Sequence, residues 1–201
     1  MAIKRLSSAS IATGSKSNKF WDQDTAQGAY VPLGFVEYTS TGSGVGFNVP
    51  DDISSYTHLV YVANVRNNTS GAGFVFYFNG DVGSGNYSYT WYTGEGSTPT
   101  SGRSTSQNYL NWSQTPSTAD GDGIYGTHIF HITNINSGGN PYRTVLYRGA
   151  NDKNGSASGT TTMMALTWRQ AASLSAITFG ASGGVFMAGS TFALYGIKGG
   201  A

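Results

Sequence analysis

The stretch LVYVANVR at residues 59–66 decides the fold of this chain. It is rich in the β-branched and aromatic residues that favour strands. Successive side chains of a strand point to opposite faces, and here both faces are largely apolar until Asn64 and Arg66. A strand with two apolar faces is covered on both sides. We therefore expect residues 59–66 to form a central strand in a two-layer stack of sheets.

Further strand patterns lie on both sides of this stretch and are separated by turn residues. Pro50 ends one short run because proline has no backbone donor, and Asn79-Gly80 supplies the conformational freedom that a chain reversal needs. No segment longer than a few residues shows the 3.6-residue apolar period of a helix. The expected strands are residues 34–38, 44–49, 59–66, 73–78, 87–92, 109–112, 127–133, 144–147, 162–169, 176–179, 185–186 and 191–197.

Many short strands with loops between them predict an all-β fold, an antiparallel β-sandwich that is jelly-roll-like. Residues 30–201 are expected to form a single sandwich domain, since sandwiches of about 200 residues commonly fold as one unit. The Gly- and Ser-rich stretches around residues 94–106 and 151–162 are expected to be loops.

Residues 1–29 differ in composition and are interpreted as an extended N-terminal arm. Few apolar side chains, widely spaced, do not repay a backbone entropy of about 1–2 kcal/mol per residue, so such an arm needs a surface to hold it. The arm either docks on a neighbouring subunit or adds an edge strand to its own sandwich. The candidate assembly residues of the arm are Ile3, Lys4, Arg5, Leu6, Ile11, Phe20 and Trp21.

The chain has few charges: 10% of its residues are charged, against about 25% in an ordinary domain, and its formal net charge is +1. Such a surface has little repulsion to keep neighbours apart, and it lacks the attraction on which nonspecific nucleic-acid binding depends. There are no cysteines, so disulfides and thiolate metal sites are excluded. No apolar run reaches the length of a signal peptide or a membrane span, so we expect synthesis in a cytoplasm and no membrane insertion.

The densest aromatic segment of the chain is NYSYTWY at residues 86–92. A two-residue period places Tyr87, Tyr89 and Trp91 on one face of a strand. If that face is exposed, the three rings are a candidate platform for stacking on glycans. If it is buried, they are part of the core, to which aromatic rings contribute a large apolar area. The exposure of Trp91 distinguishes the two alternatives.

Neither the histidines nor the paired acids predict a metal or another cofactor. His128 and His131 lie three residues apart in an expected strand, which places them on opposite faces, whereas metal ligands converge on one point. His58 is expected at the start of a strand with a hydrogen-bond partner. The segments DGDG at 120–123 and DKNG at 152–155 lack the closing Glu of a calcium loop, so we interpret them as turns.

The sequence predicts no enzyme. Hydrolysis of a glycan needs two acids held several ångströms apart in a cleft, and Glu37, Asp81 and Glu95 cannot be brought together from the sequence. The Gly-Ser-Gly triplet at 83–85 precedes an expected strand, whereas the nucleophile motif of serine hydrolases precedes a helix.

Several strand-and-turn segments, taken in order, resemble a family of small all-β virion proteins of tailed bacteriophages. The resemblance runs from about Gly34 to Ile197. The segments that carry it are residues 55–62, 76–81 running into 86–89, 176–179 and 188–197.

This resemblance implies a structural protein on the exterior of a virus particle, without enzymatic activity. The leading hypothesis is a capsid decoration (cement) protein that stabilises the head through contacts of its arm and its sandwich with other virion proteins, such as the major capsid protein. The alternative is a tail-fibre or head-fibre module that binds a host surface glycan, with the aromatic face and the loops near residues 94–106 as the binding candidates. The third reading is a glycan-degrading enzyme or an unrelated lectin-like domain. The resemblance also implies a homo-oligomer, with a trimer as the expected form.

Overall fold

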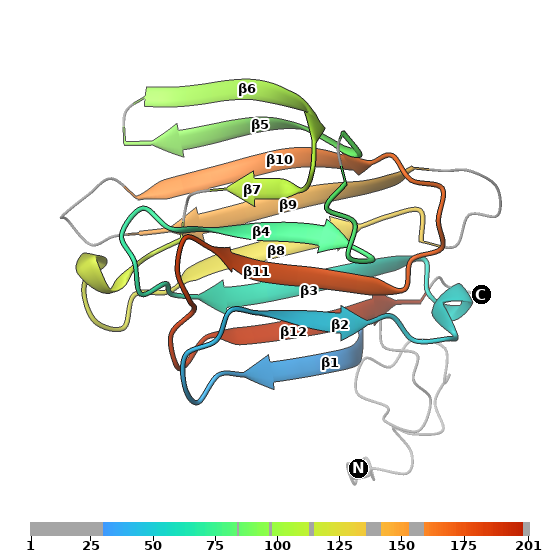
Figure 1. Cartoon of the computed structure of the whole chain (residues 1–201), viewed down its shortest axis with the longest axis horizontal. Coiled ribbons are helices and arrows are strands. Elements are labelled where there is room, and N and C mark those ends of the chain that lie inside the picture. The colour runs from blue at the N-terminus through green and yellow to red at the C-terminus, as the bar shows by residue number, and fades with distance from the viewer. Residues whose placement is uncertain are drawn as a thin grey trace, which may run out of the picture.

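The structure is a computed structural model that describes residues 30–83, 85–96, 98–112, 115–135, 142–152 and 159–198. These residues contain twelve β-strands and two short 3₁₀ helices, η2 (Ile53–Ser55) and η3 (Thr118–Asp120), and no α-helix (Figure 1). The all-β prediction is confirmed. The strands are β1 (Val31–Glu37), β2 (Gly44–Asn48), β3 (His58–Val65), β4 (Gly73–Phe78), β5 (Tyr87–Glu95), β6 (Thr98–Gln107), β7 (Leu110–Trp112), β8 (Gly126–Ile132), β9 (Arg143–Asn151), β10 (Thr160–Trp168), β11 (Ala176–Ser182) and β12 (Thr191–Ile197).

The strands form two antiparallel sheets that pack as a sandwich, with the smaller sheet in front in Figure 1. The large sheet has the order β1-β12-β3-β8-β9-β10-β5-β6, and the small sheet has the order β2-β11-β4-β7. The last two strands are inserted between the first ones: β12 lies between β1 and β3, and β11 lies between β2 and β4. With β8 and β7 completing the two sheets, these eight strands have the jelly-roll order, so this prediction is also confirmed.

Two inserted hairpins extend the large sheet. The β5–β6 hairpin follows β4, the β9–β10 hairpin follows β8, and together they add the order β9-β10-β5-β6 beyond β8. Because the small sheet ends at β7, the β5–β6 hairpin projects past it in Figure 1. We call this hairpin the overhang.

The prediction of a loop around residues 94–106 is wrong, because most of these residues are in strands. β5 runs to Glu95, the chain turns at Gly96 with φ of 55°, and β6 pairs back along β5 from Thr98. As the edge strand of the large sheet, β6 is mostly exposed on both faces and shows no apolar alternation. Its conformation is fixed by backbone pairing with β5, which leaves little trace in the residue types. The strand predicted at Val185–Phe186 is reduced to isolated bridges.

Aromatic rings from both sheets form the core. Phe76 of β4 stacks on Phe130 of β8 with ring centroids 4.1 Å apart, and Phe74 stacks on Phe179 of β11 at 4.8 Å. Tyr61 of β3 packs edge-on against Phe76 and Phe130. β3 pairs with a strand on each side, which confirms the central position expected for residues 59–66.

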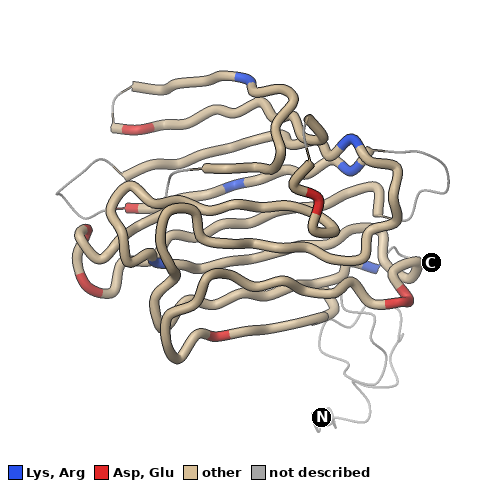
Figure 2. The backbone as a smooth tube through the Cα atoms, in the orientation of Figure 1, with Lys and Arg blue, Asp and Glu red and all other residues tan. Residues whose placement is uncertain are grey.

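The N-terminal arm, residues 1–29 with Ile3, Lys4, Arg5, Leu6, Ile11, Phe20 and Trp21, lies outside the described residues, so the expectations about it stay predictions. Where the chain is described, the structure contains no helix with the length and apolar character that crossing a membrane requires. Figure 2 shows that the few charged residues lie mainly at strand ends and in connections.

Candidate functional site

The aromatic stripe of β5 lies on the inner face of the large sheet. Tyr87 and Tyr89 are buried in the core, and the Tyr87 hydroxyl accepts a hydrogen bond from the Phe78 amide at 3.0 Å. Burial raises the pKa of Tyr87, which therefore stays a neutral phenol. Of the two alternatives for the stripe, the core is the right one for these two rings, since they present no open face to a glycan.

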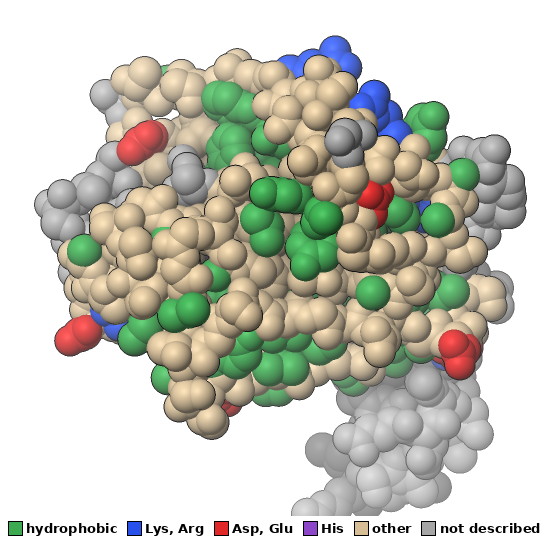
Figure 3. Space-filling model, in the orientation of Figure 1, with side chains coloured by type: hydrophobic (Ala, Val, Ile, Leu, Met, Phe, Trp, Pro, Cys, Tyr) green, Lys and Arg blue, Asp and Glu red, His purple; other side chains and the backbone are tan. Residues whose placement is uncertain are grey.

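Trp91 is half-buried and lies where the overhang passes beyond the small sheet. Its ring centroid is 5.3 Å from that of Trp112 in β7, at an interplanar angle of 59°. On its other side the ring lies against Gly102 of β6, where a Cβ would come within 2.6 Å of it. In Figure 3, hydrophobic side chains are visible over β5, above β7. Trp91 is thus the one member of the stripe with surface left for a ligand.

A polar hollow of about 350 Å³ lies where the chain passes from the large sheet to the small one. It is lined by Ser106, Gln107, Asn108, Tyr109 and Asn111, and we call these five residues the hollow. Ser106 has a φ of 55°, uncommon for a residue with a side chain, and it lies in an irregular stretch of the β5–β6 pairing. All five lining side chains are neutral and carry hydrogen-bonding groups.

Three large apolar side chains stand exposed close together on the outer face of the large sheet, the face turned away from the small sheet, whereas a fourth, Phe35, is exposed on the same face in β1 at the opposite edge. The three are Tyr92 of β5, Leu146 of β9 and Met163 of β10, with 53%, 45% and 49% of their surface exposed. Met163 lies directly opposite Tyr92, and Leu146 lies opposite Ala165, two residues along β10. Cross-strand and diagonal neighbours lie about 5 and 7–8 Å apart, so the three form one group, which we call the outer patch.

Two charged side chains, Arg148 and Arg103, lie beside the outer patch. Arg148 of β9 is opposite Met163, and its guanidinium donates to Nε2 of His131 at 3.2 Å. Because arginine has no acceptor, His131 accepts through Nε2 and is neutral in this arrangement. Partial burial lowers the pKa of His131, and the nearby positive charge of Arg148 lowers it further. Arg103 of β6 is exposed opposite Thr90 and is a diagonal neighbour of Tyr92 on the same face, so two fixed positive charges lie beside the outer patch.

The two strand histidines of β8 lie on opposite faces, as predicted. His131 is on the outer face, whereas His128 is buried in the core with its Nδ1 2.9 Å from the Tyr147 hydroxyl. His58 begins β3, and its Nδ1 is 2.9 Å from the Thr57 hydroxyl, which confirms the expected strand-start position and hydrogen bond.

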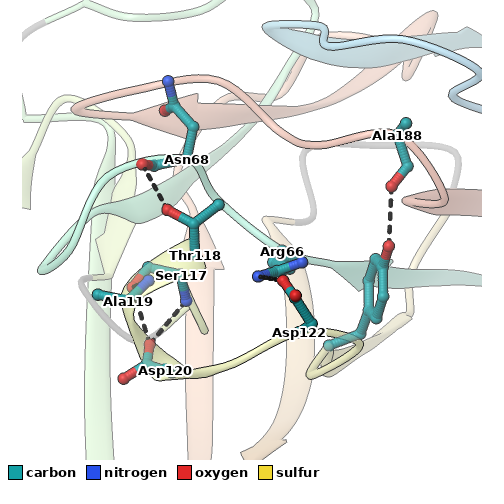
Figure 4. A network of polar contacts seen from close by, with 9 residues as sticks. Arg66, Asn68, Ser117, Thr118, Ala119, Asp120, Asp122 and Ala188 are labelled. Atoms are coloured by element: carbon teal, nitrogen blue, oxygen red, sulfur yellow. Dashed lines mark hydrogen bonds and ion pairs between the residues drawn. The ribbon is translucent and has the colours of Figure 1, made fainter.

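The acids at residues 120–123 contact the protein's own groups (Figure 4). Asp120 caps η3 by accepting from the backbone amide and the hydroxyl of Ser117, at 2.7 and 2.9 Å. Asp122 forms an ion pair with Arg66 at 3.1 Å. Both carboxylates thus hold the connection between β7 and β8, as the turn interpretation predicted. Most of the second such segment, residues 153–155, lies outside the described residues.

The three acids considered for hydrolysis are not brought together. Glu37 ends β1 at one edge of the large sheet, and Glu95 ends β5 near the opposite edge. Asp81, after β4, accepts hydrogen bonds from the Trp168 indole at 2.7 Å, the Asn86 side chain and the Gly83 amide. Burial raises the pKa of Asp81, but these hydrogen bonds outweigh it and lower the pKa overall. Asp81 therefore serves to fasten the β4–β5 turn to β10.

Two of these features, the outer patch and the hollow, were not predicted from the sequence. The outer patch had a signal in the alternation TTTMMALTW of β10, where Met163 falls on the exposed face. The hollow had none, because Ser, Asn and Gln also populate ordinary loops. No protein-family model, curated protein or solved structure matches this chain. The resemblance to phage virion proteins therefore stays a prediction.

Proposed function

We propose that the protein is a structural component of the exterior of a virus particle, a capsid decoration protein that stabilises the head through contacts with neighbouring subunits. The observation that carries this proposal is the outer patch, three exposed apolar side chains on adjoining strands of a broad sheet. Contiguous exposed apolar groups on a folded protein mark contact surfaces. The location on a virus particle is inferred from the sequence resemblance alone.

The low charge of the chain supports the same proposal. With a formal net charge of +1 and few charged side chains, copies of this protein repel one another weakly when they are packed closely. Contacts made by apolar and hydroxyl side chains depend little on salt. Around the outer patch the neighbours are mostly threonines, among them Thr90, Thr144 and Thr161, which suit a dry interface rimmed by hydrogen bonds.

We further propose that the sandwich and the arm contact different partners. The outer patch joins copies of the protein into a homo-oligomer, for which a trimer is the expected form. Residues 1–29 attach that oligomer to the major capsid protein or to another virion component. In this arrangement the sandwich covers the particle surface, and the arm adds further contacts.

The test is to locate the protein on intact particles of the virus that encodes it, with antibodies raised against the purified chain. Labelling distributed over the whole head supports a decoration protein, and unlabelled particles refute a virion role. A Met163→Arg variant tests the outer patch itself. Its matched control is Val82→Arg, because Val82 is equally exposed, at 51%, but lies after β4 and outside the patch. Only Met163→Arg is expected to lower the oligomer mass measured by light scattering.

The second candidate function is a fibre module that binds a host glycan. It is favoured by Trp91, whose half-buried indole beside Trp112 retains surface at the overhang. Labelling confined to the tail or to a few vertices supports this candidate over decoration. The same images therefore decide between the two.

A further inference from the structure

We propose that the hollow at the β6–β7 connection is a binding site for a neutral saccharide. The hollow is formed by residues 106–109 and 111, whereas the outer patch is on the outer face of β5, β9 and β10. The proposal therefore does not depend on the outer patch, nor on whether the protein is found on a head or a tail.

The backbone that carries the hollow is held on both sides by strand pairing. Tyr87 and Tyr89 of β5, two residues apart, lie opposite Gln107 and Ser104 of β6, three residues apart, so β6 contains one extra residue. Such bulges re-aim side chains and are common next to binding sites. The Gln107 side-chain amide donates to the Thr105 carbonyl at 2.9 Å and spans the bulge.

On the other side of the hollow, β7 pairs with β4 of the small sheet. Leu110, at the start of β7, is fully buried opposite Phe76, so the segment is anchored between two exposed asparagines. Asn108 and Asn111 therefore project from a backbone that the core holds in place. A site with a fixed backbone loses less entropy when it binds a ligand.

The chemistry of the lining matches a polyhydroxylated ligand without charge. Each Asn or Gln side chain offers two donors and an acceptor, and the Ser106 and Tyr109 hydroxyls both donate and accept. Sugar hydroxyls have the same dual character, so the lining can match them as both donors and acceptors. Within the described parts of the chain, no hydrogen bond engages the side chains of Asn108, Tyr109 or Asn111.

The lining also selects against other ligand classes. Among the residues that the structure describes, no lysine, arginine or histidine lines the hollow to pair with a phosphate or carboxylate, and no acid lines it to pair with a cation. Its volume of about 350 Å³ is at the lower end of the range for small-molecule sites, about 300–1,000 Å³. We therefore assign to it one or two sugar units, bound with a Kd on the order of millimolar, as a small ligand in an open site requires.

The test is a titration of the isotope-labelled full chain with glucose, galactose, mannose and N-acetylglucosamine, followed by backbone amide NMR shifts. We expect at least one of these sugars to move the amide signals of residues 106–111 with a saturable dependence. Glucuronic acid is the charged comparator and is expected to bind more weakly than glucose. Shifts that centre on Trp91 instead, no saturation up to about 50 mM, or equal binding of glucuronic acid would each overturn the proposal.

Variants assign the binding to the hollow. Asn108→Ala combined with Asn111→Ala is expected to weaken binding about tenfold or more, because two hydrogen bonds are lost. Tyr109→Phe keeps the ring and removes only the hydroxyl, so a smaller loss is expected. The matched control is Asn48→Ala, because Asn48 is also an exposed asparagine but lies in β2, and binding should not change there. If the asparagine double variant, folded by its amide spectrum, binds as tightly as the parent chain, the assignment is refuted.

Discussion

His128 makes the stability of this protein depend on pH in a window that can be stated in advance. The imidazole is buried in the core, 4.7 Å from the Phe74 ring and within hydrogen-bond distance of the Tyr147 hydroxyl. Burial disfavours the charged imidazolium and lowers the pKa of His128 from 6.5 to about 3. Between these two values the unfolded chain binds a proton that the folded chain excludes.

The sign and size of the effect follow from this difference. Since the unfolded state binds more protons, the free energy of unfolding falls as the pH falls below 6.5, by about 1.4 kcal/mol per pH unit. From pH 7 to pH 4.5 the loss due to His128 is about 2.5 kcal/mol. This is a large share of a typical stability of about 5–15 kcal/mol.

The assay is urea unfolding at pH 7 and pH 4.5 for the parent chain, His128→Gln and His131→Gln. His128→Gln lowers stability at both pH values but removes most of the pH dependence. His131 is on the outer face and more exposed, so His131→Gln should keep most of that dependence. If the parent chain and His128→Gln lose the same free energy between the two pH values, or if His128 titrates near pH 6.5 in the folded protein, the placement of this side chain in the core is wrong.

Three further predictions concern contacts in the sandwich. Gly149→Ala places a methyl group onto the Tyr147 hydroxyl, and we expect a loss of about 1–3 kcal/mol in urea unfolding, whereas a loss below about 0.5 kcal/mol would contradict the close approach. Gly102→Ala displaces the Trp91 indole and is expected to shift its fluorescence, while Gly94→Ala, with open space around it, is the control that should leave the spectrum unchanged. Asp81→Asn weakens the hydrogen bonds from Trp168 and Asn86, so we expect a loss of about 1–2 kcal/mol at pH 7. Because the pKa of Asp81 is lowered, the parent's advantage over Asp81→Asn should persist below pH 4 and disappear as the pH falls through the folded pKa; a difference independent of pH would contradict the role of its charge.

The sequence predicted the parts of the fold that depend on buried apolar side chains. Residues 59–66, with two apolar faces, became the central strand β3, and the histidines three residues apart in β8 separated to opposite faces as a two-residue period requires. The jelly-roll-like sandwich class was also predicted, from the many short strands with loops between them, and the strand order of the two sheets confirms it. In each case the spacing of apolar residues along the chain indicated which side chains are buried away from water.

The edge strand β6 could not be predicted in the same way. TPTSGRSTSQ has no apolar alternation, because neither of its faces is fully covered and its pairing with β5 uses only backbone groups. The hollow depends on the bulge at the end of that strand, so it was missed for the same reason. For the aromatic stripe, the sequence predicted only that Tyr87, Tyr89 and Trp91 share one face of a strand. Which rings are buried depends on where the small sheet ends, and that is a property of the whole fold.

The proposed contact surface is tested most directly by hydroxyl-radical footprinting of intact virus particles, with the purified chain as the reference. Exposed tyrosine and methionine side chains oxidise readily, and Tyr92 and Met163 report on the outer patch. We expect strong protection of both residues in the particle, with Tyr109 of the hollow still oxidised. Equal oxidation of Tyr92 and Met163 in the particle and in the purified chain, or absence of the protein from particles, would contradict this proposal.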